Sequence, residues 1–170
     1  MVAQSIDRRR VLGALGALGA LGVAPSAAFS KDFVDLNWTD LIPEGQPKIP
    51  PGFQSMIQHD VPAMSVQQPP SQGVRTDWNG EIVRLPGYIV PIDHSSTGVT
   101  AFILVPFVGA CVHVPPPPAN QLVFVTTGKP YESSGLFEAV NVIGMFGTAS
   151  TSTQLADIAY ALSADEIVPF

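Results

Sequence analysis

The chain has 170 residues and a formal net charge of −6, with 46% hydrophobic and 13% charged residues. A chain of this length suits one domain that buries a hydrophobic core. Its acidic balance argues against binding to nucleic acid or to anionic lipid surfaces, because both depend on clustered Lys and Arg.

Residues 1–30 have the pattern of a removable export signal. Arg8–Arg10 precede Val11–Ala24, a stretch of 14 residues rich in Gly, Ala and Leu, and small residues follow it. An arginine cluster before a weakly hydrophobic stretch is typical of twin-arginine signals, with a Sec signal as the alternative. Fourteen residues thinned by glycine fall short of the roughly 20 apolar residues that a spanning helix needs. We therefore expect cleavage near Ala28 or Ser30 and a periplasmic protein without stable membrane insertion.

Residues 31–76 are expected to form a short helix and a proline-rich extended segment. In "DFVDLNWTDLIP", Asp35 or Asn37 can cap a single turn that docks Trp38 on the domain, and Pro43 ends this turn. The following sequence is rich in proline and has no sustained hydrophobic period, which predicts an extended segment.

Residues 77–170 are expected to form a β-barrel that begins with four strands. Asn79–Gly80 is a turn signal, and in "EIVRLPGYIVPID" we expect a bulge or a short hairpin at Pro86–Gly87. The nearly all-apolar run "VTAFILVPFVGACVHV" predicts a strand buried on both faces. The third and fourth strands are "NQLVFVTT" and "LFEAVNVIGMFGTAS", the latter with Gly144 and Gly147 as bend positions.

The C-terminal sequence "STQLADIAYALSADEIVPF" predicts a helix. Leu155, Ile158, Ala159 and Leu162 recur at the spacing i, i+3, i+4, i+7, and the alanines between them favour a helix. This helix would close one face or end of the sheet. The expected fold class is therefore mainly β, a small OB-like β-barrel with one C-terminal helix and a proline-rich N-terminal extension.

Three stretches, "LPGYIVPID", "TAFILVPFVGACVHVPPPPANQLVFV" and "STQLADIAYALSADEIVPF", resemble the exported bacterial family named domain of unknown function 3299, and "LNWTDLIP" resembles its first motif. The resemblance implies a small OB-type β-barrel, exported or membrane-anchored, often encoded beside ABC-type transporters linked to metal handling. It matches Cys111, His113, Pro115–Pro118 and Asn120–Gln121 position by position, and it places Asp93 where members carry an acidic residue. The family's biochemical activity is unassigned.

The stretch "GACVHVPPPP" holds the single cysteine of the chain, which therefore cannot form an intramolecular disulfide. On a strand, Cys111 and His113 would point to the same face with Cα atoms roughly 6.5–7 Å apart. Thiolate and imidazole can then both reach one zinc or copper ion. A further ligand is expected from Asp93, His94 or His59, or from a second chain.

Other uses of Cys111 need other residues. A Rieske cluster needs two Cys-x-His pairs, and the chain has no second cysteine. A blue-copper site could draw on His94 and Met145, although one residue between Cys and His is tight for its loop. A Cys–His nucleophilic pair needs the imidazole within about 3.2 Å of the sulfur, and the sequence offers no visible oxyanion hole. The structural alternative is a buried cysteine beside a proline run that shapes a loop.

The sequence thus predicts a periplasmic, non-catalytic binding protein in which Cys111 and His113 bind zinc or copper in support of an envelope ABC-type transporter. The alternatives are a structural module that docks a partner without metal, and a thiol-based enzyme. His59 and Met64, in the proline-rich segment, are expected to be solvated when no metal recruits them. The partner surface or pocket wall is expected from the rest of the motif, namely Pro115, Pro116, Pro117, Pro118, Asn120 and Gln121.

Overall fold

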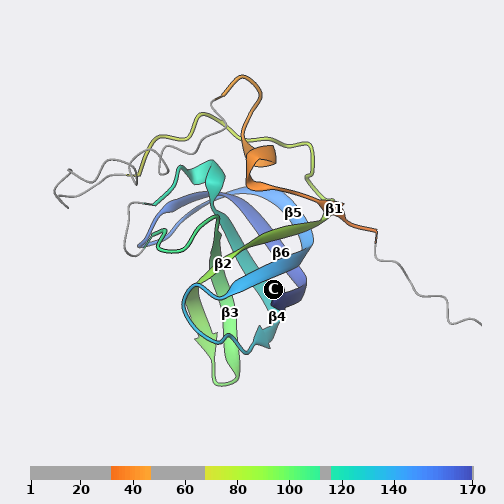
Figure 1. Ribbon diagram of the computed structural model, residues 1–170, viewed down its shortest axis with the longest axis vertical. Helices are drawn as coiled ribbons and strands as arrows, with labels where there is room; N and C mark the ends of the chain where they lie inside the picture. Colours follow the sequence, from red (N-terminus) through yellow and green to blue (C-terminus); the bar gives the residue numbers. More distant parts are fainter. Residues whose placement is uncertain (1–31, 47–67, 112–115, 170) are drawn as a thin grey trace, which may run out of the picture. The chain divides into compact units, whose positions relative to one another are not determined.

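The computed structural model describes residues 32–46, 68–111 and 116–169 (Figure 1). Several sequence predictions lie outside the described residues: the signal peptide with its cleavage sites, His59, Met64, His113 and Pro115. Within the described segments, no helix is long and apolar enough to cross a membrane.

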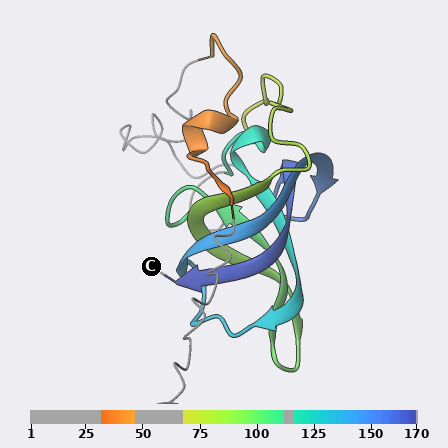
Figure 2. The ribbon, with the colours of Figure 1, turned by 90° about the vertical axis from the view of Figure 1, so that its right-hand side faces the viewer.

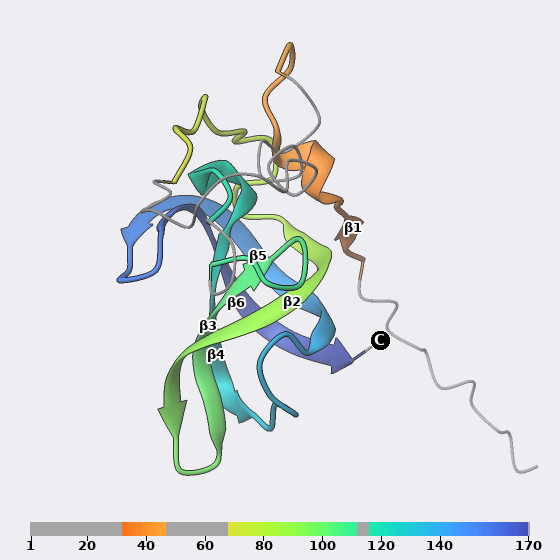
Figure 3. The ribbon, with the colours of Figure 1, turned by 60° about the vertical axis from the view of Figure 1, so that its left-hand side comes forward.

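Five strands close into a barrel, which confirms the mainly β class. They are β2 (Ile82–Ser95), β3 (Gly98–Val105), β4 (Val123–Tyr131), β5 (Ala139–Ser152) and β6 (Asp157–Pro169). Their order is β2-β3-β4-β6-β5, and pairing between β2 and β5 closes the ring. Neighbouring strands are antiparallel except β4 and β6, which are parallel. Figures 2 and 3 show how strongly the long strands curve around the barrel.

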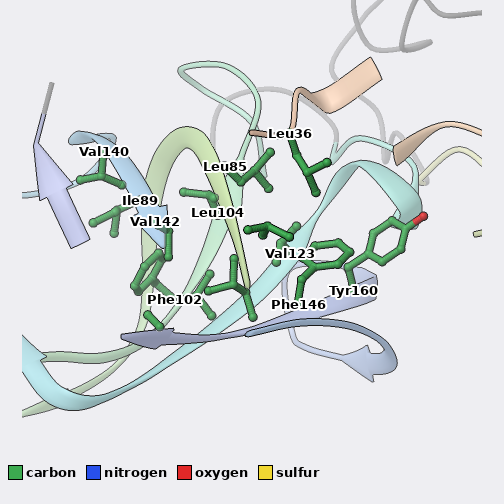
Figure 4. Close-up of a cluster of buried hydrophobic side chains, with 14 of the residues drawn as sticks. Leu36, Leu85, Ile89, Phe102, Leu104, Val123, Val140, Val142, Phe146 and Tyr160 are labelled. Carbon is green, nitrogen blue, oxygen red and sulfur yellow. The ribbon is translucent and has the colours of Figure 1, made fainter. Parts of the chain in front are cut away.

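Alternate side chains of these strands pack into two apolar clusters on opposite faces of the sheet. The inner cluster receives residues from all five barrel strands and includes Phe102, Leu104 and Tyr160, each 0% exposed (Figure 4). The outer cluster contains the residues between them on β3, Ile103 and Val105. Because successive side chains of a strand point to opposite faces, the outer cluster lies on the outside of the barrel.

Residues 32–46, which precede the barrel, pack beside the start of β2. The short strand β1 (Val34–Asp35) runs parallel to the start of β2, and the 3-10 helix η1 (Trp38–Leu41) follows. Leu41 is fully buried in the inner cluster, and the indole N–H of Trp38 donates to the carbonyl of Pro86 over 2.7 Å. The predicted helical turn and the docking of Trp38 are therefore confirmed.

The sequence predicted a hairpin or bulge at Pro86–Gly87, and this prediction was wrong. β2 passes through both residues without a register shift and pairs with β5 there. A Cβ at position 87 would lie 2.8 Å from Cγ of Leu104. Glycine therefore serves close packing between the curved strand and its neighbour rather than a turn.

The predicted buried strand over "VTAFILVPFVGACVHV" was wrong in its second half. β3 ends at Val105, and the chain turns at Pro106, which has no N–H for the strand ladder. Gly109 and Cys111 then take positive φ values of 94° and 67°. Phe107, Ala110 and Cys111 of this loop pack on the outer cluster, whereas Val108 is exposed. Packing of the loop therefore explains much of the apolar character of the run.

The predicted C-terminal helix was also wrong, because residues Asp157–Pro169 form β6. Ile158, Tyr160, Leu162 and Ala164 alternate as buried positions. β6 pairs with β4 on one edge and with β5 on the other. Tertiary pairing on both edges therefore outweighs the helix propensity of the intervening alanines.

Candidate functional site around the GACVHVPPPP stretch

Cys111 lies in the loop between β3 and β4 and covers the outside of the barrel. Phe107 and Ala110, 8% and 0% exposed, belong to the outer cluster, and the half-buried Cys111 packs against it. Its φ of 67° is unusual for a non-glycine residue. The predicted geometry, in which Cys111 and His113 share one face of a strand, is therefore wrong at Cys111.

Burial raises the pKa of the Cys111 thiol to about 11. A thiol with this pKa is protonated at neutral pH, whereas nucleophilic and metal-binding cysteines act as thiolates. The cause is desolvation, since burial disfavours the charged thiolate. The environment thus stabilises a neutral, packed thiol.

The structure does not bring Asp93 and His94 to Cys111. Both lie where β2 approaches its hairpin with β3, near the pair Ser95 and Gly98. Cys111 lies in the loop that follows the opposite end of the same ladder, beyond Val105, and packs on the outer cluster. Across the described ranges, no three His, Cys, Asp or Glu side chains come together as a metal site would require.

His94 instead borders an open hollow of about 470 Å³ at the far end of the barrel. Its backbone N–H donates to the carboxylate of Asp93 over 2.8 Å, which shapes the hairpin. Glu132 and Ser133 line the other side of the hollow. This hollow is open and lined by both polar and apolar residues, and among the described residues His94 brings the one imidazole to it.

Asn120 and Gln121, at the end of the motif, form hydrogen bonds with residues that precede the barrel. Asn120 and Gln121, 5% and 1% exposed, lie on the 3-10 helix η2 (Ala119–Gln121). The Asn120 amide donates to the carbonyl of Gly73 over 2.9 Å, and the Gln121 amide donates to the carbonyl of Trp38 over 3.0 Å. The surface predicted for a partner is thus occupied by residues that precede the barrel.

We call residues 68–81 the strap, because they cross the end of the barrel near η2 (Figure 1). At its start, the side-chain amide of Gln68 donates to the carbonyl of Pro117 over 2.8 Å. The proline run therefore contributes a backbone acceptor that holds the strap. Pro117 and Pro118 are buried, and Pro116 is partly buried.

Tyr160 is the anchor that sequence reasoning missed. Its hydroxyl donates to the carbonyl of Leu41 over 2.9 Å and accepts the backbone N–H of Arg75 over 2.7 Å. The ring is 0% exposed and stacks near Phe146, with centroids 5.1 Å apart. The available signal was a tyrosine at an interior position of an alternating strand, because a buried hydroxyl needs partners.

Gln121 carries the single buried side-chain atom without a hydrogen-bond partner in the described part of the chain, its Oε1. Its amide nitrogen donates to two carbonyls, those of Trp38 and Asn120. The side chain is therefore oriented by its amide donor, and its acceptor oxygen stays without a partner.

The turn between β4 and β5 is organised by the carboxylate of Glu138. It accepts hydrogen bonds from the hydroxyls of Tyr131 and Ser133 and from the backbone N–H of Ser134, at 2.7–2.8 Å. Burial opposes ionisation, but these donors outweigh it and lower the pKa of Glu138. Burial and the carboxylate together raise the pKa of Tyr131 to about 12. The preceding Phe137 has a φ of 61° and packs against the outer cluster.

Comparison with known proteins identifies the family. A search of curated proteins gives no match. The family model for "Protein of unknown function (DUF3299)" matches residues 38–169. The crystal structure of a DUF3299 family protein from Pseudomonas aeruginosa PAO1 is 35% identical to this chain, with a TM-score of 0.67, and the match covers 82% of this chain and 97% of that one. The chain therefore belongs to the DUF3299 family of proteins of unknown function.

Proposed function

We propose that this protein is an exported, non-catalytic binding module that docks a protein partner. The strand order β2-β3-β4-β6-β5, with β4 and β6 parallel, supports an OB-type barrel. Barrels of this type are general binding scaffolds, and the function resides in the loops that each one carries.

The observation that carries this proposal is the environment of Cys111. Its side chain packs on the outer apolar cluster, and burial raises its pKa to about 11. The polar residues of the same motif, Asn120 and Gln121, are buried and bonded to backbone carbonyls. A stretch whose cysteine packs on the barrel and whose amides bind backbone carbonyls suits a structural role better than a catalytic one.

Export and the choice of partner are parts of the proposal that depend on the sequence. Residues 1–30 have the features of a twin-arginine signal, which supports a periplasmic location. Without them, five Lys and Arg oppose 13 Asp and Glu, so the mature protein has a net charge of −8. The family resemblance implies a component of an envelope ABC-type transporter as the partner.

Transition-metal binding is the competing proposal, and the spacing of Cys111 and His113 supports it. A zinc or copper ion would have to deprotonate the buried thiol and recruit ligands other than Asp93 and His94, which lie at the other end of the β2–β3 ladder. A second chain or His59 would supply them. The geometry around Cys111 favours docking over this alternative.

Elemental analysis of protein purified without chelators separates the two proposals. Docking predicts well below one zinc or copper per chain, both in the wild type and in a Cys111→Ala, His113→Ala double variant. Stoichiometric metal in the wild type that is lost in the folded double variant would contradict docking as the function of this stretch. Circular dichroism of both proteins checks that the fold persists.

A further inference from the structure

Strands β5 and β6 extend beyond the barrel as a two-stranded arm, Thr148–Ala159, which projects in Figure 3. β5 pairs with β2 only as far as Met145, and β6 pairs with β4 only from Tyr160 onward. Within the arm, the two strands pair with each other. Among the six strands that the structure describes, none other than β5 and β6 themselves pairs with the arm.

One side-chain amide covers the β6 edge of the arm by imitating a strand. Gln68 Nε2 donates to the carbonyl of Asp157 over 2.8 Å, and Gln68 Oε1 accepts the N–H of Asp157 over 2.8 Å. A paired strand would make the same two contacts with its backbone. The glutamine thus stands in for a peptide unit at this edge.

A second side-chain amide covers the β5 edge in a similar way. Asn79 Oδ1 accepts the N–H of Thr148 over 2.8 Å, and Asn79 Nδ2 donates to the Thr148 hydroxyl over 3.0 Å. Beside it, the N–H of Gly80 donates to the carbonyl of Phe146 over 2.8 Å. Both residues belong to the strap, so one segment covers both edges of the arm.

The strap is held at few points between these two ends. Residues 70–74 are exposed, and no regular secondary structure occurs from Gln68 to Thr76. Its anchors between Gln68 and Asn79 are the Asn120 amide at Gly73, the Tyr160 hydroxyl at Arg75 and the partly buried Trp78, which packs on the inner cluster. A segment with many exposed backbone groups and few buried contacts opens at low free energy.

We propose that the arm is a strand-acceptor site for an extended polypeptide segment of the protein partner, and that the strap occupies this site in the isolated protein. This inference rests on the proposed docking function for the existence of a partner. Exposed strand edges bind extended peptides through main-chain hydrogen bonds, and the two amides show that these edges accept peptide-like groups. The segment Thr148–Ser152, "TASTS", is uncharged and rich in Thr, which suits pairing with a strand of either charge.

The probe for this site is a labelled synthetic peptide with the sequence of the strap, residues 68–81. A Gln68→Ala, Asn79→Ala double variant removes both edge contacts and leaves the barrel core untouched. Ser71→Ala is the matched control, because among the described residues its hydroxyl donates within the strap, to the carbonyl of Gly73. Fluorescence anisotropy measures peptide binding, and NMR hydrogen exchange follows the amides of Thr148 and Asp157.

We expect these two amides to exchange at least tenfold faster in the double variant than in the wild type or in Ser71→Ala, and added peptide to restore their protection. We also expect the peptide to bind the double variant at least tenfold more tightly than the wild type. Unchanged exchange at both amides, or equal peptide binding to the folded wild type and double variant, would overturn the inference. Neither result depends on the metal content, so failure of this site is distinguishable from failure of the proposed docking function.

Discussion

Replacing Tyr160 with Phe tests whether the N-terminal segments are fastened to the barrel through one hydroxyl. The substitution keeps the buried ring and its contact with Phe146, so it creates no cavity. It removes the donor to the Leu41 carbonyl and the acceptor of the Arg75 N–H. The loss is therefore confined to two hydrogen bonds that join distant parts of the chain.

The cost follows from the burial of the two groups left behind. Leu41 is 0% exposed, and a buried carbonyl without its donor costs about 1–3 kcal/mol. The Arg75 N–H is only partly buried and can be hydrated, so its loss costs about 0.5–1.5 kcal/mol. We expect Tyr160→Phe to lower the free energy of unfolding by about 2–4 kcal/mol.

Urea unfolding of the wild type and variant measures this difference, with the denaturation midpoint shifting at a constant m-value. Tyr131→Phe is the control, because its hydroxyl donates to the partly buried carboxylate of Glu138 over 2.8 Å, and its loss should cost about 1 kcal/mol or less. A change of less than about 0.5 kcal/mol for Tyr160→Phe would refute the fastening role, because even one exposed hydrogen bond contributes that much.

Three further substitutions follow from the same structure. Gly144→Ala should prevent stable folding, because the added Cβ would collide with a backbone carbonyl of β6. Gly147→Ala should be tolerated, since the nearest atom to its added Cβ is 3.9 Å away. Thermal unfolding of the two variants tests this difference. Gln121→Leu should cost about 1–3 kcal/mol in urea unfolding because the Trp38 carbonyl loses its donor, and an unchanged midpoint would be inconsistent with that bond. Because folding lowers the pKa of Glu138, ionised Glu138 stabilises the fold at pH values above its unfolded-state pKa. This stabilisation is lost as the pH falls through its folded-state pKa. Glu138→Gln should therefore flatten stability below about pH 5, and an unaltered acid limb of the stability curve would exclude this contribution.

The sequence predicted the strands better than their ends and their partners. Alternation located the start of β2, and an apolar run located the start of β3. Of the two predicted caps, Asp35 and Asn37, the second precedes η1. The β6 sequence fits both a helix and a strand. Its buried residues Ile158 and Leu162 are four positions apart, a spacing that places them on one face of a helix and also on one face of a strand. Only the long-range pairing with β4 and β5 decides between the two, and a local pattern does not contain that information.

The sequence analysis assigned the wrong local geometry to Cys111, which lies in a loop and not on a strand. The apolar run through Phe107 and Ala110 indicated burial, which the structure bears out on the outer cluster. It did not reveal the turn after Val105, because a loop that packs on an apolar surface has the same composition as a buried strand. Gln68 and Asn79 belong to no periodic pattern in the sequence. Their hydrogen-bond partners could therefore not be predicted, because tertiary structure alone brings them together.

The rate at which Cys111 reacts with an alkylating reagent tests the central claim most directly. At pH 8, a thiol with a pKa of about 11 is about 0.1% thiolate, against about a quarter for a free cysteine of pKa about 8.5. We therefore predict that native protein reacts at least about 100-fold more slowly than protein unfolded in urea, and that the rate keeps rising with pH beyond 9. Native Cys111 reacting as fast as the unfolded thiol, with a midpoint below pH 8.5, would contradict a packing role and indicate a thiolate site.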